Sequence, residues 1–195
     1  MKLLVQSDDY AISPAVARGI LYGIENGIIR NTGMFMNMPW SVECGKLIMP
    51  YLDKIALGID LNLTTGTPLT KPDLIPSLVQ DNGAFHTSNE SRTLDAKAEN
   101  QEHAVLEEVI LELENQIKRF VELFGRKPDY VHPHAYATPA IIHAESELAK
   151  AYGIPFSLDV FHKIFKLETT LPKMEWYLKP ATPENQLKSS LKTYI

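Results

Sequence analysis

Hydrophobic residues recur along this chain with two different periods, which predict strands and helices in alternation. Residues 54–63 alternate with the period of two that is typical of a β-strand, and five aliphatic residues would share one face: Ile55, Leu57, Ile59, Leu61 and Leu63. Residues 102–124 repeat every three to four positions, which predicts an amphipathic helix, and Gly125 follows where helices commonly end. Further strands are predicted at 3–6, 32–36, 130–134 and 156–160, and further helices at 14–26, after Ser13-Pro14, and at 139–152.

This order of strands and helices predicts an α/β fold with a mostly parallel sheet or barrel. A chain of 195 residues can bury a core, so we expect a single domain over residues 1–195. Residues 64–100 are rich in Thr, Pro, Asn, Ser and Gly, which predicts a long loop or lid, because ordered domains rarely carry so long a connection without a functional role. The tail from about residue 168 has a mixed pattern and is not assigned.

Composition narrows the classes of function. The net charge of -5 gives no electrostatic reason to expect a nucleic-acid partner, which needs a basic surface. No apolar run is long enough to span a membrane, and the apolar start of the chain is too short for a secretory signal. The single cysteine, Cys44, excludes an intrachain disulfide and a thiolate metal cluster. We therefore expect a cytoplasmic protein.

Three clusters of polar residues lie near the ends of predicted strands, where parallel α/β folds place their active sites. Asp8 and Asp9 are adjacent carboxylates, which repel each other unless a cation or a proton lies nearby. Asp60 has apolar neighbours on both sides, so we expect its carboxylate to be at least partly buried, which is costly without a partner or a metal. His132 and His134 are two residues apart in an extended segment and would point to the same side.

Each cluster also has an ordinary structural interpretation. The acidic pair could form a solvated turn in which Asp9 or Ser13 caps the next helix. Asp60 could accept hydrogen bonds from loop amides, and the two histidines could belong to a polar strand end. Together, however, carboxylates and imidazoles suit a divalent ion such as Zn²⁺, Mn²⁺ or Mg²⁺. With a metal-activated water and a spare carboxylate to accept its proton, such a site could hydrolyse an amide or an ester.

Several segments resemble the YdjC-like carbohydrate deacetylases, in the same order and spacing from about residue 2 to residue 160. Residues 7–13, Ser-Asp-Asp-Tyr-Ala-Ile-Ser, resemble the family's opening Asn-Ala-Asp-Asp-Phe-Gly-Leu-Ser. Residues 58–64, Gly-Ile-Asp-Leu-Asn-Leu-Thr, are similar to its Gly-Leu-His-Leu-Asn-Leu-Thr. Residues 124–128, Phe-Gly-Arg-Lys-Pro, followed by 132–134, His-Pro-His, are similar to its Gly-Arg-Lys-Pro and later Asp-Ser-His.

The resemblance implies a distorted or incomplete TIM-like β/α barrel that removes acetyl groups from N-acetylated sugars such as chitooligosaccharides. It implies that Asp8 is the general base and that Asp9 and His134 are metal ligands. Asp60 stands where the family has a ligand histidine, and His132 stands where it has an aspartate. We expect Asp60 to be a third ligand and His132 to be a fourth ligand or a residue that contacts one. The additional negative charge would favour harder ions.

Other departures from the family affect the predicted activity. Tyr136 and Thr138 replace further histidines of the family, and the chain ends before an expected His-Pro-Gly motif, so we expect a divergent, shortened member. Our prediction is a metal-dependent deacetylase that acts on a small acetylated carbohydrate. The alternatives are a catalytically degenerate domain that binds a sugar or a partner, and a hydrolase of another amide or ester. An incomplete barrel would expose strand edges, which predicts a homo-oligomer, most simply a dimer.

Overall fold

Four short parallel strands form one sheet in the order β1-β2-β3-β4, in a computed structural model that describes residues 5–159. The strands are β1 (Gln6–Tyr10), β2 (Asn31–Met34), β3 (Ala56–Leu61) and β4 (Val131–Pro133). Each neighbouring pair is parallel. The predicted α/β class with a parallel sheet is therefore confirmed, and all four strands bring their carboxyl ends to the same edge.

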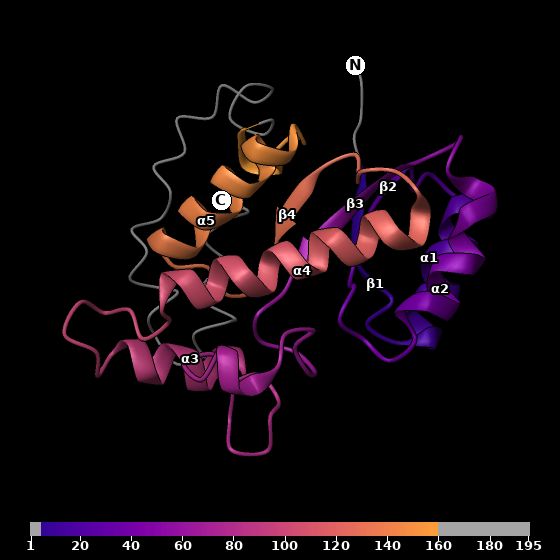
Figure 1. Cartoon of the computed structure of the whole chain (residues 1–195). Helices are drawn as coiled ribbons and strands as arrows, with labels where there is room; N and C mark the ends of the chain where they lie inside the picture. Colours follow the sequence, from indigo (N-terminus) through magenta and orange to yellow (C-terminus); the bar gives the residue numbers. More distant parts are fainter. Residues whose placement is uncertain (1–4, 160–195) are drawn as a thin grey trace, which may run out of the picture.

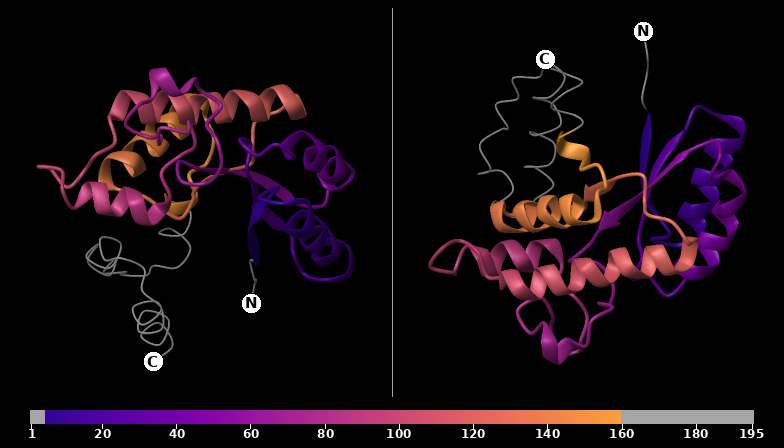
Figure 2. Two further views of the ribbon diagram at one scale, coloured as in Figure 1. Left: turned by 90° about the horizontal axis from the view of Figure 1, so that it is seen from below. Right: turned by 45° about the horizontal axis from the view of Figure 1, so that its top comes forward.

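Five α-helices accompany the sheet in the described part of the chain: α1 (Pro14–Asn26), α2 (Ser41–Ile48), α3 (Ser88–Asp95), α4 (Leu106–Phe124) and α5 (Pro139–Tyr152). Two short 3-10 helices, η1 (Met49–Tyr51) and η2 (Pro72–Leu74), join them. The helices α1 and α2 lie together beside β1 and β2, whereas α4 and α5 pack against each other beside β3 and β4 (Figures 1 and 2). The helix α3 lies near the beginning of α4 (Figure 1).

Local capping determines where several helices begin and end. The Ser13 hydroxyl accepts a hydrogen bond from the amide of Val16, and Pro14 occupies the first turn of α1. Gly125 ends α4 with a left-handed φ of 64°. The predicted helix at 102–124 begins later, at Leu106, because the amide of His103 donates to the Asp95 carboxylate outside the helix.

The central strand β3 is buried on both faces. Leu57, Ile59 and Leu61 are buried, as the alternating pattern predicts, but Gly58 and Asp60 on the other face are buried too. Burial on both faces is typical of parallel sheets that are covered by helices. The one carboxylate of β3 therefore lies inside the protein.

The first strand, predicted at 3–6, is β1 at Gln6–Tyr10, so the acidic pair lies within the strand and not after it. Two further sequence predictions need correction. The predicted strand at 156–160 is only an isolated bridge between Phe156 and Val131, and the residues that follow it to 159 are helical. Residues 64–100 are not a bare loop, because they contain η2, α3 and a bridge between Val79 and Phe85. Residue 160 and the tail from 168 lie outside the described residues.

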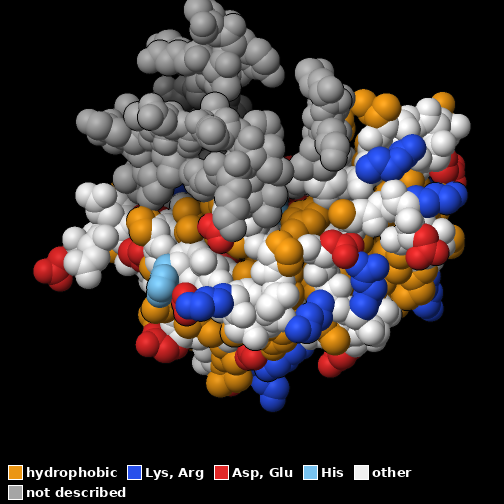
Figure 3. All heavy atoms as spheres, turned by 90° about the horizontal axis from the view of Figure 1, so that it is seen from above, with side chains coloured by type: hydrophobic (Ala, Val, Ile, Leu, Met, Phe, Trp, Pro, Cys, Tyr) orange, Lys and Arg blue, Asp and Glu red, His pale blue; other side chains and the backbone are white. Residues whose placement is uncertain are grey.

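The surface carries both signs of charge. On the face seen in Figure 3, lysine and arginine side chains lie among acidic and apolar ones rather than in a single basic area. In residues 5–159 no helix combines the length and the apolar character needed to cross a bilayer.

A buried carboxyl group on α5 gives a prediction for stability. Glu145 is fully buried, its Oε2 has no hydrogen-bond partner among the described residues, and burial raises its pKa well above the usual value. A raised carboxyl pKa means that stability is highest below the unfolded pKa and falls as the pH rises toward the folded pKa. We expect Glu145→Gln to raise the free energy of unfolding at pH 7 by about 1 kcal/mol or more, with the gain disappearing near pH 4.

The measurement is urea denaturation at both pH values. Glu147→Gln, an exposed carboxyl on the same helix, is the matched control and should leave stability nearly unchanged. A Glu145→Gln protein that is less stable than wild type at pH 7 would contradict the prediction.

Candidate metal centre

The acidic pair lies in an irregular part of β1. Ser7 pairs with Thr32 and Tyr10 pairs with Met34, so β1 has one extra residue in this interval, which is a β-bulge. Within the bulge, Asp9 has a left-handed φ of 66°, which is rare for a residue other than glycine. Bulges change the direction of side chains. Asp8 and Asp9 are adjacent, yet the charges of both carboxylates raise the pKa of Asp60. The bulge explains how both can lie near Asp60.

The Asp60 carboxylate of β3 lies against the backbone of Gly33 in the neighbouring strand β2. A Cβ atom on Gly33 would be 1.7 Å from Asp60 Oδ1, so the missing side chain at this position gives the carboxylate its space. In this position Asp60 Oδ2 accepts a hydrogen bond of 2.9 Å from the amide of Asp9. The carboxylates of Asp8 and Asp9 on β1 and of Asp60 on β3 thus lie at one edge of the sheet, and Gly33 of β2 leaves room between them.

Asp60 has an unfavourable environment for a lone charge. Burial raises the pKa of Asp60; the hydrogen bond from the Asp9 amide lowers it, and the carboxylates of Asp8 and Asp9 raise it further. Asp60 Oδ1 is buried and has no hydrogen-bond partner among the described residues. A proton or a cation would relieve this environment.

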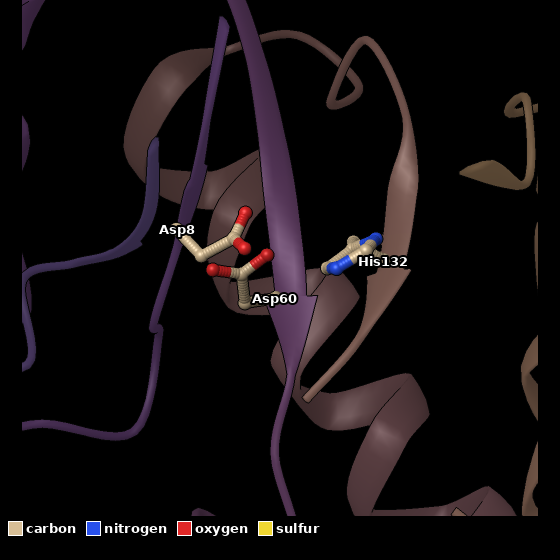
Figure 4. A group of neighbouring side chains, drawn as sticks. All are labelled: Asp8, Asp60 and His132. Atoms are coloured by element: carbon tan, nitrogen blue, oxygen red, sulfur yellow. The ribbon is translucent and has the colours of Figure 1, made fainter. Parts of the chain in front are cut away.

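One group of side chains is close enough to share an ion. Ligand atoms of Asp8, Asp60 and His132 lie within 4.8 Å of one another. Figure 4 shows the carboxylates of Asp8 and Asp60 turned toward each other, with the His132 ring approaching from β4. The Nδ1 atom of His132 lies 2.8 Å from the Ser157 hydroxyl, and burial lowers the pKa of His132, which favours the neutral imidazole that metals bind.

The other predicted residues form a second pair. His134 Nδ1 lies 3.0 Å from Asp9 Oδ1, and the His134 ring makes an edge contact with Phe35 at a centroid distance of 4.6 Å. The amide of His134 donates to the carbonyl of Leu61, the residue after Asp60. All five predicted residues therefore lie in one region, but the shared group contains Asp8 and His132, whereas the resemblance implies Asp9 and His134.

The residues present fit a divalent cation. They offer carboxylate oxygens and imidazole nitrogens, which suit Mg²⁺, Mn²⁺ or Zn²⁺, and the buried Asp60 Oδ1 has no hydrogen-bond partner within residues 5–159.

Comparison with known proteins identifies the family. The family model described as "YdjC-like protein" matches residues 2–193. The chain belongs to the YdjC-like family.

Curated relatives of this YdjC-like protein are deacetylases by name. A carbohydrate deacetylase of Clostridium beijerinckii is 31% identical over 157 residues, and the match covers 80% of this chain and 59% of the relative. A chitooligosaccharide deacetylase of Serratia marcescens is 31% identical over 159 residues, and this match also covers 80% of this chain and 59% of the relative. The chain thus spans about three-fifths of the length of these relatives.

A solved structure supports the fold. The crystal structure of an Enterococcus faecalis protein named for cellobiose-phosphate cleavage matches with a TM-score of 0.68 at 23% identity, over 84% of this chain and 63% of that one. The four-stranded parallel sheet of the YdjC-like chain is therefore consistent with a distorted TIM-like barrel fold.

Sequence reasoning missed two residues that shape this site. Gly33 makes room for Asp60, and the only local indication is a glycine inside a predicted strand, which often marks a close approach. Ser157 contacts His132 from a segment that was expected to be a strand. Nothing in the sequence near Ser157 pointed to this contact.

Adding a methyl group at Gly33 tests the packing of Asp60. We expect Gly33→Ala to lower the free energy of unfolding by about 1–3 kcal/mol, because the Asp60 carboxylate has to move within a packed interior. The control is Gly19→Ala in α1, where a Cβ meets nothing within 4 Å and should stabilise the helix by up to about 1 kcal/mol. Equal stabilities of both variants in urea denaturation would show that Asp60 does not fill this space.

Proposed function

We propose that this YdjC-like protein is a metal-dependent deacetylase that removes acetyl groups from a small N-acetylated sugar or oligosaccharide. The observation that carries the proposal is the buried Asp60 carboxylate. Its Oδ1 has no hydrogen-bond partner among residues 5–159, its Oδ2 accepts a hydrogen bond from the amide of Asp9, and Asp60 shares a group of ligand atoms with Asp8 and His132. The names of the relatives supply the substrate class.

The proposed cation ligands are Asp9, Asp60 and His134, with His132 as a further ligand or as a residue that contacts one. The placement of Asp60 supports its role, because its carboxylate accepts a hydrogen bond from the amide of Asp9 and lies in one group with Asp8 and His132. The distances within the group that contains Asp8 support the competing set of Asp8, Asp60 and His132. A second carboxylate among the ligands favours hard ions such as Mg²⁺ and Mn²⁺ over Zn²⁺.

Asp8 is the proposed general base. It is the exposed member of the acidic pair, so a proton that it accepts from water can pass on to solvent. The side-chain amide of Gln6 donates to its Oδ1, which orients the carboxylate. A divalent cation at this site would polarise the acetyl carbonyl and make an attacking water more acidic. His132, held at Nδ1 by Ser157, would present its other nitrogen toward the same group of donors.

Manganese binding tests the ligand set. We expect Asp60→Asn to weaken Mn²⁺ binding about 100-fold or more in isothermal titration, because it removes a buried charged donor. Asp9→Asn and His134→Gln should weaken binding similarly, whereas Asp8→Asn should have a small effect. Asp53→Asn, an exposed carboxylate outside the site, is the control. Strong losses in Asp8→Asn and His132→Gln but not in Asp9→Asn would replace the proposed set by the competing one.

Acetate release tests the reaction. With N-acetylated chitooligosaccharides and Mn²⁺, we expect wild-type protein to release acetate and Asp8→Asn to reduce kcat by about 10²–10⁴-fold, because the proton acceptor is lost. Binding of Mn²⁺ and of the sugar without acetate release would favour a degenerate binding domain. Hydrolysis of other amides or esters, without acetate release from the sugars, would favour a hydrolase with a different substrate. The expected cytoplasmic location and homodimer stay predictions.

A further inference from the structure

The helix α3 contacts the loop that follows His134 at two consecutive residues. The Arg92 guanidinium donates a hydrogen bond of 3.0 Å to the carbonyl of Ala135. The Tyr136 hydroxyl donates one of 2.6 Å to Asp95 Oδ2. Arg92 and Asp95 lie one turn apart on α3, so a single short helix holds both residues after a predicted ligand.

Asp95 is a strong acceptor in this arrangement. It is fully buried and also accepts bonds from the amide and the Nδ1 atom of His103, at 2.9 and 2.6 Å. Burial raises the pKa of Asp95, but the hydrogen bonds from His103 and Tyr136 outweigh it and hold the pKa below its usual value. Asp95 is therefore charged near neutral pH, and hydrogen bonds to a charged acceptor are the stronger kind.

The loop needs such support because its backbone is strained. Ala135 has a φ of 53°, in the left-handed region that residues with a Cβ rarely adopt. Such a conformation persists only where surrounding contacts impose it. Helix α3 contacts Ala135 and Tyr136, the two residues that follow His134. The amide of His134 itself donates to the Leu61 carbonyl of β3.

We propose that α3, through Arg92 and the Asp95–Tyr136 hydrogen bond, positions the His134 imidazole toward Asp9 at the metal centre. Tyr136 and Asp95 are positioning residues in this scheme and touch neither substrate nor metal. The segment expected to be a lid thus has a part that fixes the site. The inference rests on the proposed function only in treating His134 as a metal ligand.

The test compares two tyrosine substitutions that each remove one hydroxyl bonded to a carboxylate. Tyr136→Phe removes the bond to Asp95, and Tyr152→Phe, at the end of α5, removes the bond of 2.9 Å to Glu114 on α4. Imidazole nitrogen NMR signals of the metal-free protein report on His134, assigned by their absence in His134→Gln. Isothermal titration with Mn²⁺ reports on the assembled site.

We expect Tyr136→Phe to shift or broaden the His134 signals and to weaken Mn²⁺ binding by about 10-fold or more, as loss of a residue that orients a ligand does. Tyr152→Phe should leave both measurements at the wild-type value, although both variants lose some thermal stability. A purely structural role of Tyr136 would lower stability without changing the His134 signals.

Unchanged His134 signals in Tyr136→Phe overturn the inference, whether or not the protein binds Mn²⁺. Wild-type protein that binds no Mn²⁺ would instead overturn the proposed function. The NMR comparison would then still decide whether α3 positions His134.

Discussion

Burial of the Asp60 carboxylate is the constraint on which the rest of the site depends. Strand β3 is covered on both faces, so this side chain does not reach solvent, and its Oδ1 has no hydrogen-bond partner among residues 5–159. Because Gly33 leaves room for it, the Asp60 carboxylate accepts a hydrogen bond from the amide of Asp9. This one bond offsets only part of the free-energy cost of burying a charge. A carboxylate in such a place stabilises the fold only when a proton or a cation accompanies it, which links the packing of the sheet to the proposed chemistry.

Backbone strain is concentrated around the same edge of the sheet. Asp9 and Ala135 both have left-handed φ values although neither is glycine, and each lies next to a predicted site residue. Distant contacts hold both in place: Asp60 accepts from the amide of Asp9, and Arg92 donates to the carbonyl of Ala135. The strain is therefore balanced by bonds that cross between strands and helices, as is common where a fold fixes reactive groups.

The proposed ligands differ in type from those that the family resemblance implies. A carboxylate at position 60 and an imidazole at position 132 replace the reverse arrangement that the family resemblance implies. The exchange keeps the number of carboxylates but moves one of them to the buried position 60, among the proposed ligands, whereas burial lowers the pKa of the His132 imidazole, which contacts Ser157. A carboxylate in place of an imidazole among the proposed ligands is the physical basis for expecting a harder metal ion.

The sequence by itself determined three of the helices, most of the strands and the neighbourhood of the site, but not α2, α3 or the structure at residue 156. Periods of two and of three to four residues, the Ser13 cap and Gly125 depend on local sterics and local hydrogen bonds, so they could be read directly and predicted a parallel sheet with its polar residues at one edge. Only the tertiary structure decided which carboxylate meets which histidine and that α3 holds the loop after β4. Those pairings join residues far apart in the chain. They depend on the bulge in β1, on the missing side chain at Gly33 and on two strained residues, Asp9 and Ala135, whose effects no local pattern records.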